Sequence, residues 1–140
     1  PREYSSAASD VYKRQLHTNS AVKTVERVLG MYPPEEQESV RRSLSESLLG
    51  VIAQGLIKTK DAKRTAYHDI LINTDACKEY IQRGALDEVE DIMERSGFDG
   101  MVTTNQSLLA LVEAGRIDRD QAVAVSLKPN ELAQALRGRS

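Results

Sequence analysis

Apolar residues recur at helical spacing in the part of the chain before residue 56. Residues 21–29 place valines and a leucine on one face, after a serine that can cap a helix and before a glycine that can end it. The run 33–36, Pro-Pro-Glu-Glu, predicts the start of a second helix, because proline suits the first turn and acids favour the positive end of the helix dipole. This helix is predicted to continue to Gly55 and to bury an apolar stripe, which consists of Val40, Leu44, Leu48, Leu49 and Ile52.

The chain after residue 55 predicts a β-hairpin followed by short helices. The strands are expected over residues 56–59 and 65–72, around the polar turn 60–63. Capping residues and glycines then delimit five helices. These are predicted over residues 76–83 and 87–93, from Thr103 or Thr104 to Gly115, after Asp118, and from Pro129. The predicted fold is therefore mainly α with one β-hairpin.

Composition changes this picture mainly by excluding classes of protein. Nineteen Lys and Arg are spread among twenty-one Asp and Glu, and a net charge of -2 gives no basic field for nucleic acid. The longest apolar run, residues 48–53, is too short for a transmembrane segment. Cys77 is the only cysteine and the two histidines stand apart, so neither a disulfide nor a metal site is expected. No glycine-rich phosphate loop, Ser-His-Asp set or pair of acids stands out, so no catalytic residue is predicted.

The first residues of the chain read as a sequence of foreign origin. Residues 5–15, SSAASDVYKRQ, resemble a translated transposase adapter of the kind used to make sequencing libraries. We therefore interpret residues 1–15 as a non-native tail and leave them out of the fold prediction. Residue 16 is expected to be the first native residue, and residues 16–140 are expected to form an N-terminally truncated protein.

Several motifs after residue 15 resemble the type IV pilus retraction ATPases of the type II/IV secretion ATPase family. Residues 16–21, LHTNSA, look like the end of the histidine box of that family. Thr24, Glu26 and Arg27 fall on its Thr-x-Asp-Arg motif, with glutamate in place of aspartate. Residues 44–48, LSESL, match a run that is typical of the retraction motors.

The segment 76–83, ACKEYIQR, is similar to the family's helical motif AIRNLIRE, which is needed for retraction. Ala76, Ile81 and Arg83 keep the pattern of that motif. Three positions depart from it, namely Cys77, Lys78 and Tyr80. Further on, residues 100–117 match the pattern of the family's C-terminal helices.

The resemblance implies a RecA-like P-loop ATPase domain, which is an α/β parent for this mainly α chain. Residues 16–72 would form the end of the RecA-like core with its hairpin, and residues 73–140 the C-terminal helical region. It implies a homo-hexamer that uses ATP and Mg²⁺ to power pilus retraction. The motor would lie in the cytoplasm, peripheral to the inner membrane through contacts with the pilus machinery. Because neither Walker motif is present, the chain alone is expected to bind no cofactor and to be inactive.

The same resemblance implies roles for individual residues. His17 and Thr18 are expected near the nucleotide, and Arg27 in the nucleotide cleft or at a subunit interface. The charged residues of the segment 76–83 are expected to contact the neighbouring subunit or the pilus machinery. The thiol of Cys77 is expected to pack as a small apolar group and not to be reactive.

Two other functions remain open at this point. The chain would fit a related ATPase of type II secretion or pilus assembly, although the run 44–48 argues against that. It would also fit a non-catalytic helical adaptor. A DNA-binding module is disfavoured by the acidic pI, near 5.8, and by the lack of a recognisable recognition helix.

Overall fold

The computed structural model describes residues 20–138. The expected tail, residues 1–15, and the histidine-box residues His17 and Thr18 lie outside the described residues. The elements follow in the order α2 (Ala21–Leu29), α3 (Pro34–Ser47), β1 (Gly50–Lys58), β2 (Arg64–Ile72), α4 (Asp75–Arg83), α5 (Leu86–Glu94), the short 3₁₀ helix η1 (Gly97–Asp99), α6 (Thr104–Glu113), α7 (Arg119–Val125) and α8 (Pro129–Arg137).

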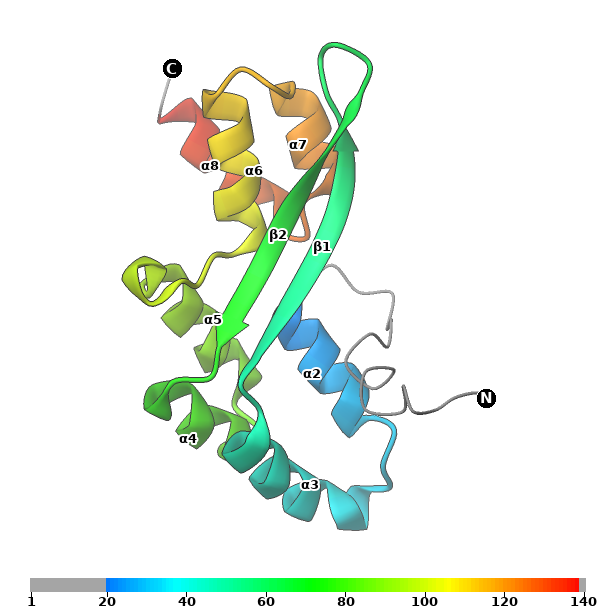
Figure 1. Cartoon of the computed structure of the whole chain (residues 1–140), viewed down its shortest axis with the longest axis vertical. Coiled ribbons are helices and arrows are strands. Elements are labelled where there is room, and N and C mark those ends of the chain that lie inside the picture. The colour runs from blue at the N-terminus through cyan, green and yellow to red at the C-terminus, as the bar shows by residue number, and fades with distance from the viewer. Residues whose placement is uncertain (1–19, 139–140) are drawn as a thin grey trace, which may run out of the picture.

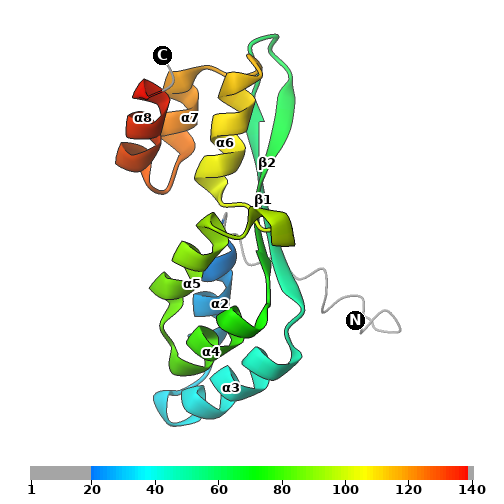
Figure 2. The same ribbon diagram turned by 90° about the vertical axis from the view of Figure 1, so that its left-hand side faces the viewer.

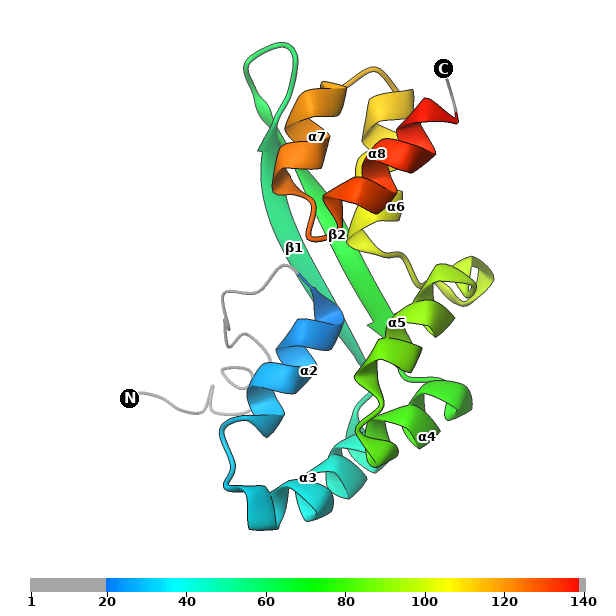
Figure 3. The same cartoon turned by 180° about the vertical axis from the view of Figure 1, so that it is seen from behind.

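A long antiparallel hairpin forms the spine of the molecule, and the helices pack along it (Figure 1). Helices α2, α4 and α5 lie beside one half of the hairpin and α6, α7 and α8 beside the other, with α3 across the end (Figure 3). The side view shows these helices on one face of the two strands, and within residues 20–138 no helix covers the opposite, open face (Figure 2). The predicted class, mainly α with one β-hairpin, is confirmed.

The hairpin register fixes which side chains face the helices. The strands pair from Gly50 with Ile72 to Lys58 with Arg64, and alternate residues of β1 point inward. At the turn predicted over residues 60–63, the backbone N–H of Thr59 donates to the carbonyl of Lys63 at 2.8 Å. The turn is therefore where the sequence predicts it, and β2 begins within one residue of its predicted start.

The predicted extent of the second helix is wrong. The helix ends at Ser47, and residues from Gly50 onward belong to β1. A helix continued to Gly55 would leave the backbone groups of residues 67–72 without their ladder partners, and sheet pairing satisfies them. The predicted stripe is divided as a result. Leu44 and Leu48 pack against the core, whereas Leu49 is 88% exposed and Ile52, on the open face of the hairpin, is 70% exposed.

Gly55 therefore does not end a helix. It lies inside β1 opposite Tyr67, where a Cβ atom would lie so close to the Cζ atom of the tyrosine ring as to overlap it. Tyr67 is buried, and its ring fills the space that a side chain at residue 55 would need. Glycine is required at residue 55 because the Tyr67 ring approaches the backbone too closely to leave room for a side chain.

Most of the later helix boundaries follow their caps. Thr103 and Gln106 form a reciprocal capping box at the start of α6, and Gly84 ends α4 in the left-handed conformation with φ 78. Helix α5 differs from its prediction at both ends. It begins after Ala85, with Asp87 inside the first turn, and its C-cap is Arg95.

Two hydrophobic clusters make up the core. The first joins α2, α4 and α5 to Leu71 and Met101, and α3 packs against it. The second joins α6, α7 and α8 to Ile57 and Tyr67 near the tip of the hairpin. The hairpin contributes to both clusters, so it connects them. Within residues 20–138, no helix combines the length and apolarity that a bilayer crossing requires.

Candidate functional site

Helix α4, which carries the motif-like segment 76–83, has two distinct faces. Cys77 and Ile81 are fully buried in the first cluster. Their spacing of four residues places them on one side of the helix. Ala76 and Arg83 are exposed, so only part of the segment is available to another molecule. The burial of the Cys77 thiol agrees with a packing role for this side chain.

The exposed side of α4 carries an ordered set of charges. A guanidinium nitrogen of Arg83 lies 2.5 Å from a carboxylate oxygen of Glu79, one turn earlier. The guanidinium carbon also lies 5.5 Å from the centre of the Tyr80 ring. Nearer the start of the helix, the Lys78 ammonium is 4.0 Å from the Asp75 carboxylate. These contacts orient Arg83 and Lys78 without burying them.

Helix α3 holds the end of α4 through a side chain that sequence reasoning missed. The Nε atom of Arg41 donates a hydrogen bond of 3.1 Å to the backbone carbonyl of Gln82, in the last turn of α4. A cation in this position satisfies a terminal carbonyl and complements the negative end of the helix dipole. A shallow groove of about 490 Å³ follows the junction, lined by Glu38, Arg41, Arg42, Glu79, Gln82 and Arg83. We call this the α3–α4 groove.

The structure does not bring Arg27 to this groove. Arg27 lies exposed near the end of α2, in a separate open hollow that it shares with Lys23, Glu26, Gly30 and Met31. Within residues 20–138 its guanidinium forms no ion pair. It is therefore available to an acid on another segment or another subunit.

The sequence lacks the phosphate-loop motif of P-loop ATPases. No glycine in the sequence is followed by Lys-Ser or Lys-Thr, so a phosphate loop is lacking. In the part of the chain that the structure describes, no three His, Cys, Asp or Glu side chains are placed to hold a metal ion.

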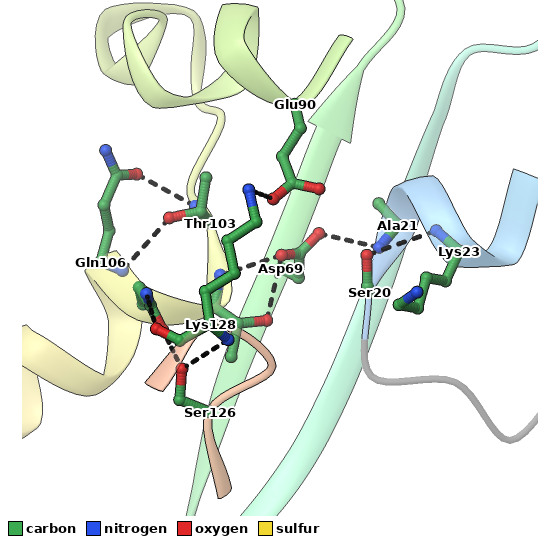
Figure 4. A network of polar contacts seen from close by, with 11 residues as sticks. Ser20, Ala21, Lys23, Asp69, Glu90, Thr103, Gln106, Ser126 and Lys128 are labelled. Carbon is green, nitrogen blue, oxygen red and sulfur yellow. Dashed lines mark hydrogen bonds and ion pairs between the residues drawn. The ribbon is translucent and has the colours of Figure 1, made fainter. Parts of the chain in front are cut away.

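A polar network between the two hydrophobic clusters is the other prominent arrangement (Figure 4). Its centre is Asp69, whose buried carboxylate accepts hydrogen bonds from α2 and from α6. Burial raises the pKa of the Asp69 carboxyl, and the hydrogen bonds from Ala21 and Thr104 oppose that shift. At the edge of the network the Lys128 ammonium pairs with Glu90, which raises the pKa of Lys128.

The role of Asp69 was not predicted, although the sequence contains a signal for it. Residues 67, 69 and 71 share one face of a strand, and the residues on either side of Asp69 on that face are tyrosine and leucine. An aspartate between apolar residues on the inward face must find hydrogen-bond donors once it is buried. The sequence does not say which elements supply them.

Comparison with known proteins identifies relatives of this chain. The chain is 41% identical over 108 residues to the twitching motility protein of Neisseria gonorrhoeae, covering 76% of this chain and 29% of that protein. It is 41% identical over 107 residues to the type IV pilus retraction ATPase PilT of Pseudomonas aeruginosa, covering 76% and 31%. It is 34% identical over 118 residues to the type IV pilus ATPase PilU of the same organism, covering 84% and 31%. No known protein-family profile matches the chain.

Solved structures agree with these sequence relatives. The crystal structure of the pilus retraction motor PilT with bound ADP has a TM-score of 0.76 at 28% identity, covering 96% of this chain and 40% of that one. The Legionella pneumophila ATPase DotB has a TM-score of 0.63 at 19% identity, covering 78% and 30%, and so shares the fold. The chain spans about a third or less of the length of the relatives that it matches by sequence. The chain therefore belongs to the type IV pilus ATPases of the type II/IV secretion ATPase family, and it corresponds to a C-terminal portion of those proteins.

Proposed function

We propose that this chain is the C-terminal part of a hexameric ATPase motor that powers the retraction of type IV pili. The observation that carries the proposal is the 41% identity to the gonococcal twitching motility protein and to the retraction ATPase PilT. ATP and Mg²⁺ would be bound mainly by residues of the motor that this chain lacks. His17 and Thr18 would lie beside the nucleotide.

Within that motor, the exposed side of α4 and the α3–α4 groove would deliver the mechanical output. Lys78 and Arg83 are held in place by neighbouring side chains and remain accessible, as a contact surface for a partner requires. The partner would be the neighbouring subunit or the pilus machinery at the cytoplasmic side of the inner membrane. Arg27, on the separate hollow of α2, would serve the nucleotide cleft or a subunit interface.

The similarity to PilU favours a second candidate. That alignment covers 84% of this chain, more than the 76% covered by the alignment to PilT, although at the lower identity of 34%. The chain would then belong to a pilus ATPase more similar to PilU than to PilT.

A chimera tests the proposal. Residues 20–138 replace the matching portion of the P. aeruginosa retraction ATPase, and the product is expressed in a strain that lacks that enzyme. We expect the chimera to hydrolyse ATP and to restore twitching motility. The same replacement in PilU, tested in a strain without PilU, addresses the second candidate. A chimera that assembles and hydrolyses ATP normally but leaves the cells unable to twitch would refute the retraction proposal.

A further inference from the structure

Asp69 lies where two helices from different parts of the chain begin (Figure 4). Its side chain extends from β2 and is only 6% exposed. Its Oδ1 atom accepts a hydrogen bond of 2.8 Å from the backbone N–H of Ala21, the first residue of α2. Its Oδ2 atom accepts 2.9 Å and 3.0 Å hydrogen bonds from the N–H and hydroxyl of Thr104, the first residue of α6. One carboxylate thus serves two helix N-termini.

This arrangement adds to the caps that each helix already possesses. Ser20 caps α2 by accepting from the N–H of Lys23, and Thr103 caps α6 within its capping box. The amides bound by Asp69 are further members of the group that each helix start leaves without an internal partner. A negative charge is also favoured at the positive end of each helix dipole. The carboxylate therefore stabilises both helices in one relative position.

The two helices belong to different hydrophobic clusters. Helix α2 packs in the first cluster and α6 in the second. Polar contacts connect the clusters beside Asp69, including the Lys128–Glu90 ion pair and a 3.0 Å hydrogen bond from Gln106 Nε2 to the carbonyl of Glu94. These side chains are more exposed than Asp69. Within residues 20–138, the Asp69 hydrogen bonds form a buried polar link between the two helices.

We propose that Asp69 is a positioning residue that couples the start of α2 to the start of α6, so that both helices move together. This inference rests on the proposed function in one respect: the segment directly before α2 carries His17 and Thr18, which that proposal places beside the nucleotide. A displacement of α2 during the ATP cycle is transmitted through Ala21 and Asp69 to α6. Helices α7 and α8, which share the second cluster with α6, follow it.

Amide hydrogen exchange in the 140-residue chain tests the coupling directly. Thr104→Val removes the hydroxyl donor on α6, so the Asp69 carboxylate is held less firmly, and we expect exchange at Ala21, on α2, to rise by clearly more than twofold. Thr103→Val is the matched control, since it removes the cap of α6 without touching Asp69. It should speed exchange at Gln106 and leave Ala21 within about twofold. Asp69→Asn should speed exchange at both helix starts. Unchanged exchange at Ala21 in Thr104→Val would overturn the proposal, and that result is decisive even if Asp69→Asn does not fold.

The chimeric motor tests whether the coupling is used. The measured quantity is pilus retraction per ATP hydrolysed, which a purely structural defect would leave unchanged in the molecules that remain folded. Asp69→Asn should lower this ratio, because the neutral amide offers one acceptor oxygen where the carboxylate offers two. Asp69→Glu, which keeps the carboxylate, should restore part of it. An unchanged ratio in Asp69→Asn would refute transmission through Asp69. If the unsubstituted chimera hydrolyses ATP without retracting pili, the proposed function fails, whereas the exchange experiment still decides whether the helices are coupled.

Discussion

The substitution Arg83→Ala is expected to remove the charged surface of α4 while leaving the chain folded. Arg83 and its partner Glu79 are 60% and 58% exposed, so water and salt screen their ion pair. Exposed pairs one helical turn apart contribute about 0.3–0.5 kcal/mol. The contact with the Tyr80 ring adds about 0.5–1 kcal/mol at an exposed site. The free energy of unfolding should therefore fall by at most about 1.5 kcal/mol.

Ile81→Ala, two residues earlier on the same helix, is the matched comparison. The Ile81 side chain is 0% exposed and packs in the first cluster. Truncating a buried isoleucine to alanine costs about 2–5 kcal/mol, because the loss of buried apolar surface and the cavity that remains both destabilise the fold. Ile81→Ala is thus expected to act through stability. Arg83→Ala is expected to act, if the proposed output surface is correct, through the contact with a partner.

Two measurements separate these effects. Urea unfolding of the 140-residue chain gives the free energy of unfolding of each variant. The dependence of that free energy on urea concentration, the m-value, is compared between variants to check that their unfolded states are alike. Twitching and ATP turnover of the chimera give the functional effect. We expect Arg83→Ala to abolish twitching while turnover is largely kept. A stability loss above about 2 kcal/mol for Arg83→Ala would show that the guanidinium supports the fold, and normal twitching would remove it from the output surface.

The hairpin and its network yield three further predictions. Ile57→Ala should cost about 2–5 kcal/mol, whereas Ile52→Ala, on the open face of the same strand, should cost about 0.5 kcal/mol or less; equal costs in urea unfolding would contradict the register. Gly55→Ala should lower the thermal midpoint of unfolding, because the new Cβ must displace the Tyr67 ring at a cost of about 1–3 kcal/mol. This cost exceeds what alanine gains from its lower backbone entropy in the unfolded chain. An unchanged midpoint would show that the ring does not lie against the backbone of residue 55. Burial raises the pKa of Asp69 in the folded chain above its ordinary value of 3.8, so the folded chain holds this proton to a higher pH than the unfolded chain does. The free energy of unfolding of the native chain, compared with that of Asp69→Asn, should therefore fall as the pH rises from about 3.8 through the raised pKa. A relative stability that increases with pH over that window, measured by urea unfolding, would contradict this sign.

The sequence by itself determined the class of the fold and the family of the chain. Helix starts and stops followed from local chemistry, since Thr103, Gln106 and Gly84 act on backbone groups only a few residues away. The run 44–48 and the segment 76–83 carried the family resemblance, because they are read from residue order alone. The groups that interact locally are only a few residues apart, so sequence patterns can predict these interactions.

Only the tertiary structure decided the features that depend on partners distant in the chain. Residues 50–52 fit the end of a helix as well as a strand, and pairing with residues 70–72 made them a strand. The segment 76–83 did not indicate which elements cover Ile81, because that depends on where α2, α3 and α5 pack. For Asp69, the strand pattern contains a signal for an inward carboxylate, but its donors lie 48 and 35 residues away along the chain. A buried charge requires hydrogen-bond partners, and the fold as a whole determines which residues are close enough to supply them.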